Sequence, residues 1–135
     1  MAIYPTPEQI KKLMEGPADQ PVVMINLLRY KPKADGVGAG ASGDDAYRRY
    51  ATRMREFVES KGGRFIWMGR VDSQVIGEGG EGFHAAGLVE YPSRKAFLEI
   101  AGAPHVKEIG EHRESGLEMQ WLLASTETPL RDSPR

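Results

Sequence analysis

Val22-Val23-Met24-Ile25-Asn26-Leu27-Leu28 is the stretch that decides the fold of this 135-residue chain. It is short, rich in branched residues and flanked by prolines, which together predict a β-strand. Successive side chains of a strand point to opposite faces of the sheet. One face therefore carries Val23, Ile25 and Leu27, and the other carries Val22, Met24 and Leu28. A strand that is apolar on both faces needs both of them covered.

The remainder of the chain predicts an α+β fold around this strand. We expect a single domain over residues 1–135, with a core over about 21–124, an extra N-terminal helix over 7–16 and a loose tail over 126–135. Without that helix the element order is β-α-β-β-α-β, the ferredoxin-like motif, an antiparallel sheet with helices on one face. The further elements are a long helix opened by Asp44 and Asp45, strands over 64–76 and 83–91 joined by a glycine-rich tip, helices opened by Pro92-Ser93 and Pro104, and a strand over 117–124.

The second strand repeats the two-sided pattern, with Phe65 and Trp67 opposed to Ile66 and Met68. Helices on one face of the sheet cover only half of this apolar surface. A second copy of the same sheet, related by a two-fold axis, would cover the other half. The sequence therefore predicts a homodimer.

The glycine-rich tip between the second and third strands also predicts a register. If the tip centres on Gly80, Arg70 faces Glu90 across the two strands. We expect this ion pair to be partly buried on the sheet. Trp67 and Trp121 alternate correctly with their strands, so core packing is expected for both.

Composition excludes several functional classes. The chain has 18 basic and 19 acidic residues and a net charge of −1, so no basic excess points to nucleic acid. It has no cysteine, which excludes disulfides and thiolate chemistry. No signal peptide or membrane-spanning segment is evident, so we expect a cytoplasmic protein without membrane contact.

Two motifs suggest a cofactor or metal site, but neighbouring residues argue against both. Gly38-Ala39-Gly40-Ala41-Ser42-Gly43 matches G-x-G-x-x-G, but Asp44 and Asp45 place negative charge where a pyrophosphate would lie. His105, Glu108 and His112 have a spacing that could hold a metal, but they lie beside a buried helical stripe. We therefore expect neither a nucleotide cofactor nor a metal.

Several short segments together have a recognisable pattern: Met24–Tyr30, Tyr47–Tyr50, Gly62–Arg64, Gly69–Val71, Val89–Phe97 and His112–Arg113. In these segments, over about residues 21–124, the chain resembles the family called domain of unknown function 1330. The resemblance implies a dimeric α/β barrel. That superfamily also contains cofactor-free monooxygenases, haem-degrading enzymes and lactone isomerases, each with a pocket between sheet and helices. The chain departs from the family at His105, where an aromatic residue is usual before the last helix.

These observations predict a small-molecule-binding protein of the dimeric α/β barrel type, whose pocket lies between sheet and helices. Asn26 is informative because an unpaired amide in an apolar strand would cost about 1–3 kcal/mol, so it needs a structural partner or a ligand. Two functions remain open: a cofactor-free oxygenase or isomerase acting on a flat substrate, and a non-catalytic binding or interaction module. In an enzyme, Asn26 would orient an oxygen, a histidine would move a proton and Arg113 would balance negative charge. The candidate pocket-lining residues are Asn26, Tyr50, Trp67, His84, His112 and Arg113.

Overall fold

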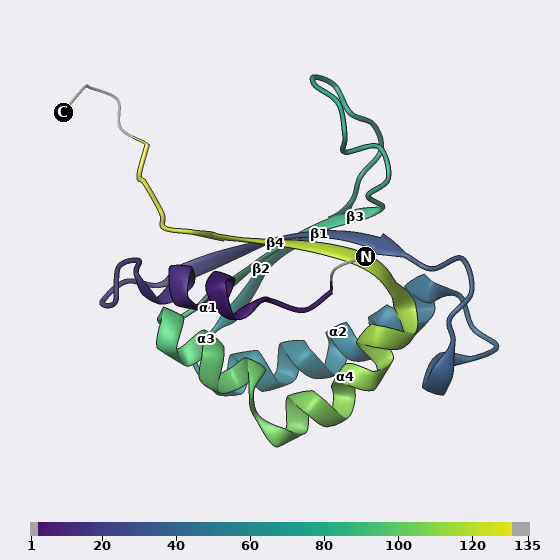
Figure 1. The fold of residues 1–135 in the computed structure, drawn as a ribbon, viewed down its shortest axis with the longest axis horizontal. Helices are drawn as coiled ribbons and strands as arrows, with labels where there is room; N and C mark the ends of the chain where they lie inside the picture. The colour runs from purple at the N-terminus through teal and green to yellow at the C-terminus, as the bar shows by residue number, and fades with distance from the viewer. Residues whose placement is uncertain (1–2, 131–135) are drawn as a thin grey trace.

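The computed structural model describes residues 3–130, and Figure 1 shows their arrangement as one sheet with helices beneath it. The last five residues of the expected tail, 131–135, lie outside the described residues. The helices are α1 (Pro7–Met14), α2 (Gly43–Ser60), α3 (Arg94–Ala101) and α4 (Pro104–Gly116), with a short 3-10 helix, η1, at Gly36–Gly38. The strands are β1 (Val22–Tyr30), β2 (Arg64–Arg70), β3 (Ala85–Tyr91) and β4 (Leu117–Ser125).

The four strands form one antiparallel sheet in the order β2-β3-β1-β4. This order places β1 in the interior, where an apolar strand is expected, and leaves β2 and β4 as edges. Helices α2, α3 and α4 lie on one side of the sheet (Figure 1). The predicted ferredoxin-like α+β fold is therefore confirmed, with α1 as the extra N-terminal helix.

Helix boundaries follow from their caps. Thr6 and Gln9 form a reciprocal capping box that opens α1. The long helix α2 begins one residue before the expected pair of aspartates, because the Ser42 hydroxyl caps it by accepting a hydrogen bond from the Asp45 backbone N–H. The aspartates lie in its first turn, where their charge suits the helix dipole.

The core between the sheet and the helices has two parts. One is a large cluster that includes Val22 and Met24, and the other is a smaller cluster around Leu28. These three β1 side chains are buried, and they share the face that points to the helices. The predicted alternation of β1 is confirmed: Val23, Ile25 and Leu27 are only half-buried on the other face.

The predicted Arg70–Glu90 pair is wrong. Arg70 lies opposite Ala85 and pairs with Asp72 in solvent, whereas Glu90 faces Arg64, with 3.1 Å between Arg64 Nε and Glu90 Oε1. The error arises from the turn, because β2 ends at Arg70 instead of continuing through residues 74–76. The chain between β2 and β3 is a long loop, so its glycines do not set the register.

A second correction concerns the faces of β2. The pairing with β3 shifts between Phe65 and Trp67, an irregularity of the β-bulge type. Phe65 lies opposite Val89 and Met68 opposite Gly87, so both point toward the helices, whereas Trp67 lies opposite Leu88 on the other face. The expected grouping of Phe65 with Trp67 is therefore wrong.

The sheet face away from the helices, called the open face below, is apolar and uncovered in the single chain. Trp67 and Trp121 are 54% and 47% exposed, so the expectation that they pack in this chain's core is wrong. Leu123 is likewise 50% exposed. By the strand register, the apolar side chains of the open face are Val23, Ile25, Leu27, Trp67, Ala86, Leu88, Met119, Trp121 and Leu123.

Candidate functional site

Three polar side chains between sheet and helices form a continuous hydrogen-bonded chain, called the polar network below. Gln120 Nε2 donates to Asn26 Oδ1 at 2.8 Å. Arg113 donates to Gln120 Oε1 from both Nε, at 3.1 Å, and Nη2, at 2.8 Å. The network therefore links a buried amide of β1 to a cation of α4 through the edge strand β4.

Strand pairing explains why these residues meet. Asn26 lies opposite Leu122 on β4 and beside the Leu28–Gln120 pair, so the side chains of Asn26 and Gln120 share the face that points to the helices. The Asn26 amide donates to the carbonyl oxygens of Met24 at 3.2 Å and, more weakly, Gly87 at 3.5 Å. The side chain of Asn26 is thus satisfied in the interior, as a buried polar group must be.

The network lies where the two core clusters meet. Asn26 falls between Met24 of the larger cluster and Leu28 of the smaller one, and Tyr50 packs against both clusters. Tyr50 also contacts Tyr47, with 5.4 Å between ring centroids. A polar strip bordered by aromatic rings thus crosses an otherwise apolar core.

The tyrosine hydroxyls are held in their protonated form. Burial raises the pKa of Tyr50, and the positive charge of Arg113 opposes part of that rise. Burial also raises the pKa of Tyr47, and the neighbouring Tyr50 adds to the effect. At neutral pH both side chains are therefore hydrogen-bond donors and not bases.

Arg113 has only uncharged partners among the described residues. Besides Gln120, its Nη2 donates to the backbone carbonyl oxygen of Ile3, and its guanidinium lies 5.1 Å from the centroid of the Tyr4 ring. Within residues 3–130, none of the ion pairs involves Arg113. A half-buried guanidinium is more often paired with a carboxylate.

The network lies near the edge of the molecule. Leu122 points to the same face as Asn26, yet it is 41% exposed on the edge strand β4. Tyr4, which lies over Arg113, is 57% exposed. A small molecule could therefore reach Arg113 from the β4 edge by displacing the N-terminal segment, without opening the core.

The structure brings together three of the six candidate residues, Asn26, Tyr50 and Arg113. Trp67 points to the open face, on the other side of the sheet. His84 is exposed next to β3, where its Nδ1 accepts a hydrogen bond from the Tyr30 backbone N–H at 2.9 Å and its ring stacks on that of Tyr30. Trp67 and His84 therefore do not belong to the polar network.

His112 is the remaining candidate. It precedes Arg113 on α4, and its Nδ1 is buried without a hydrogen-bond partner among the described residues. No hydrogen bond within residues 3–130 joins it to the polar network. His105, the first residue of the proposed metal spacing, packs against Phe57 with 5.1 Å between ring centroids.

Sequence reasoning missed Gln120. The sequence does not show which strand pairs with β4, so it gives no partner for this side chain. The signal that could have found it was its position: a neutral, hydrogen-bonding side chain in a strand otherwise bearing Met119, Trp121 and Leu122.

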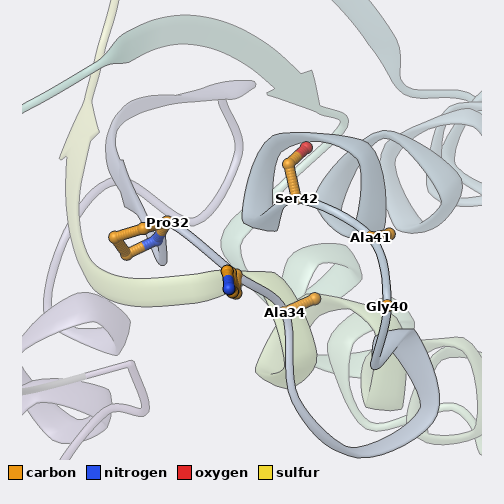
Figure 2. A pocket seen from close by; sticks show the side chains of 6 residues that line it. Pro32, Ala34, Gly40, Ala41 and Ser42 are labelled. Carbon is orange, nitrogen blue, oxygen red and sulfur yellow. The ribbon is translucent and has the colours of Figure 1, made fainter.

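Two shallow pockets lie away from the network. One, of about 390 Å³, is formed by the glycine loop and is lined by Pro32, Lys33, Ala34, Gly40, Ala41 and Ser42 (Figure 2). This loop is held in place, because the Gly38 backbone N–H donates to Ser115 Oγ at 2.9 Å and the Ala34 N–H donates to the Ala41 carbonyl. The other, of about 470 Å³, lies between α2, α3 and the start of α4, around Phe57 and His105.

Comparison with known proteins assigns a family. Residues 41–126 match the family described as Domain of unknown function (DUF1330), and the chain belongs to it. The family resemblance expected from the sequence is therefore confirmed. No curated protein matches the chain.

Solved structures support the same fold. A protein of unknown function from Rhodopseudomonas palustris is 29% identical, with 96% of this chain and 97% of that one covered at a TM-score of 0.82. A hydroxynitrile lyase from Passiflora edulis is 15% identical (84% and 98% covered, TM-score 0.60). A dabb family protein with a ferredoxin-like fold from Mesorhizobium loti is 12% identical (81% and 98% covered, TM-score 0.53). The last two likenesses concern the fold alone.

None of the helices within residues 3–130 is long and apolar enough to cross a membrane.

Proposed function

We propose that this protein binds a small, flat organic carboxylate at the polar network, with Arg113 as the anchoring residue. The observation that carries the proposal is the half-buried Arg113 guanidinium, which among the described residues has only uncharged partners. A guanidinium keeps its charge at all physiological pH values and presents a planar fork of donors that matches a carboxylate. A carboxylate would supply the negative charge that no residue within 3–130 places against Arg113.

The N-terminal segment identifies where such a ligand would lie. The Ile3 carbonyl oxygen accepts a hydrogen bond from Arg113 Nη2, and the Tyr4 ring lies over the same guanidinium. A ligand carboxylate would replace the Ile3 oxygen with a charged acceptor, and its flat body would take the place of the Tyr4 ring. A carboxylate adds opposite charge and can accept two parallel hydrogen bonds from a guanidinium, whereas the Ile3 oxygen is neutral, and this difference favours the exchange.

The neighbouring residues favour a flat ligand over a bulky one. Tyr50 lies close enough to Arg113 for that positive charge to oppose the rise in its pKa, and Leu122 adds an exposed apolar side chain at the β4 edge. Aromatic faces stack with planar groups at ring-centroid distances of about 4.5–7 Å. Gln120 holds the guanidinium in place through two hydrogen bonds and is itself bonded to Asn26.

Binding is better supported than catalysis. An isomerase or a cofactor-free oxygenase needs a group that removes a proton. The groups in the network are two amides and a guanidinium, and the neighbouring tyrosines are protonated, so none of them is a base at neutral pH. His112 would be the candidate base, and its unpartnered Nδ1 is the specific observation in favour of an enzyme.

Calorimetric titration of the full chain with benzoate tests the proposal, with benzamide as the matched neutral probe. We expect saturable benzoate binding that is at least about tenfold tighter than that of benzamide. Arg113→Met should abolish this preference, and Arg113→Lys, which keeps the charge without the fork, should weaken it. Arg48→Met removes an exposed arginine from α2 and should change nothing.

Equal affinities for benzoate and benzamide, or benzoate binding unchanged in Arg113→Met, would refute the site. A complete lack of saturable binding by benzoate and by longer arylcarboxylates would refute the proposed function. If a bound benzoate analogue with an acidic C–H exchanges that hydrogen with solvent in the wild-type protein but not in His112→Gln, the protein is an enzyme and not a non-catalytic binding module.

We further propose that the protein is a homodimer formed through the open face. Trp67, Trp121 and Leu123 are each about half exposed on this face, and large contiguous apolar patches are rare on monomeric proteins. Two sheets packed face to face would bury these side chains, with the Arg64–Glu90 and Arg29–Glu118 pairs at the rim.

Analytical ultracentrifugation tests the dimer. Leu123→Asp should produce monomers at micromolar concentration, whereas Val37→Asp, which places the same charge on an exposed residue of η1, should not. A wild-type protein that sediments as a monomer at these concentrations would refute the dimer.

A further inference from the structure

The segment that joins β2 to β3, residues 71–84, carries two of the most exposed apolar side chains among the described residues. Val75 is 88% exposed and Ile76 is 89% exposed. We call this segment the arm. It projects away from the sheet on the side opposite the helices (Figure 1).

The arm has a defined conformation held by its own hydrogen bonds. Gln74 Oε1 accepts from the Gly80 N–H at 2.7 Å, and Gln74 Nε2 donates to the Ile76 carbonyl at 3.2 Å. Glu81 Oε2 accepts from the Gly79 N–H at 3.0 Å. These bonds hold Val75 and Ile76 in solvent, where adjacent branched apolar side chains gain nothing in an isolated chain.

The base of the arm is attached to the open face. Phe83 is buried, and its ring meets that of Trp121 edge-on with 4.8 Å between centroids. Trp121 belongs to the open face because it lies opposite Leu27. The arm therefore begins on the surface that the proposed dimer would bury.

From this placement we infer that the arm docks on a second copy of the chain, with Val75 and Ile76 buried against the partner. The inference rests on the proposed homodimer. Fourteen residues separate Arg70 from Ala85, so each limb of the arm can reach up to about 23 Å. Two packed sheets lie only about 10 Å apart. A projecting arm of this length extends past the gap and lies alongside the partner.

Charge distinguishes this occupant from a membrane surface. The arm contains Asp72, Glu78 and Glu81 and no lysine or arginine. Anionic lipid headgroups would repel such a segment, whereas apolar insertion into membranes is usually accompanied by basic residues. A second copy, by contrast, offers the apolar open face beside which the arm already stands.

Sedimentation equilibrium of the full chain tests the arm. The double variant Val75→Ser, Ile76→Ser should raise the dimer dissociation constant by about 100-fold, because each dimer contains two arms. Both side chains are exposed in the single chain, so the fold should persist, which circular dichroism would verify. Val37→Ser removes an equally branched side chain, 52% exposed on η1, and should leave the dissociation constant unchanged.

The possible outcomes distinguish a failure of the proposed arm docking from a failure of the proposed dimer. If Leu123→Asp dissociates the protein while the arm variant has the wild-type dissociation constant, the arm does not dock and the dimer stands. If the wild-type protein is monomeric, the dimer and the arm both fail. If the wild-type chain co-sediments with phosphatidylserine vesicles and the arm variant does not, a membrane replaces the partner copy.

Discussion

Gln120 is the residue on which the polar network depends, and Gln120→Met should destabilise the fold by about 2 kcal/mol. Methionine has a similar length and can fill the same space. It cannot donate to Asn26 Oδ1, and it lacks the Oε1 that accepts two hydrogen bonds from Arg113. The fold should persist, because the substitution adds no bulk.

The magnitude follows from the burial of the two partners. Asn26 is 9% exposed, so its Oδ1 would lose a partner that water does not easily replace, at a cost of about 1–3 kcal/mol. Arg113 is half-buried and near the β4 edge, so water can satisfy most of its lost bond. The expected loss is therefore governed by Asn26.

Urea unfolding at one fixed protein concentration measures the loss. With a slope of about 1–3 kcal/mol per molar urea, a loss of 2 kcal/mol lowers the midpoint by about 1 M. Gln20→Met is the matched control, since Gln20 is exposed, and its midpoint should not move.

A double-mutant cycle decides whether the loss belongs to the Asn26–Gln120 contact. Asn26→Leu together with Gln120→Met removes both polar partners, so the double variant should be about 1–2 kcal/mol more stable than the sum of the single losses predicts. Additivity within about 0.5 kcal/mol would show that no such contact stabilises the protein and would refute the reasoning.

The remaining predictions use the same unfolding assay. Arg64→Met should leave the urea midpoint unchanged, because the Arg64 side chain is 64% exposed and exposed ion pairs contribute little; a clear fall would show that the pair stabilises the fold. Burial raises the pKa of Tyr47 above its ordinary value of 10.0, so the unfolded chain releases this proton before the folded one. The stability that protonated Tyr47 contributes should therefore be complete below about pH 10 and decline as pH rises toward the raised pKa. Tyr47→Phe should lessen the decline in stability between about pH 10 and 12, and an identical decline in both proteins would contradict this origin. Gly43→Ala should lower the free energy of unfolding by about 1–3 kcal/mol, because the added Cβ would overlap the Lys31 carbonyl oxygen. An unchanged urea midpoint would mean that the backbone moves apart there at no cost in stability.

Local patterns determined most of the fold. The two-sided apolar stretch at Val22–Leu28 predicts an interior strand, and β1 is an interior strand. Thr6 and Ser93 predict helix starts that the structure shows, because a cap acts within one turn of its helix. Amphipathic spacing likewise predicts α2, whose apolar stripe needs only the sheet to pack against.

Strand register could not be read from the sequence. The expected tip at Gly80 would have paired Arg70 with Glu90, but the actual loop spans 71–84 and Glu90 faces Arg64. Glycines permit many turns and specify none, so a glycine-rich loop leaves the register to side-chain packing on the sheet. The irregularity beside Phe65 then reversed which β2 side chains point to the helices.

The candidate site shows the same division. The sequence alone indicated that Asn26 needs a partner, because an amide in an apolar strand is costly unless it is bonded. It also placed Tyr50 and Arg113 on helices. That Gln120 is the partner was decided only by the tertiary structure, since 94 positions along the chain separate it from Asn26 and only the β1–β4 pairing brings them together. Periodicity acts over a few residues and predicts elements, whereas a site built from distant residues depends on how those elements pair.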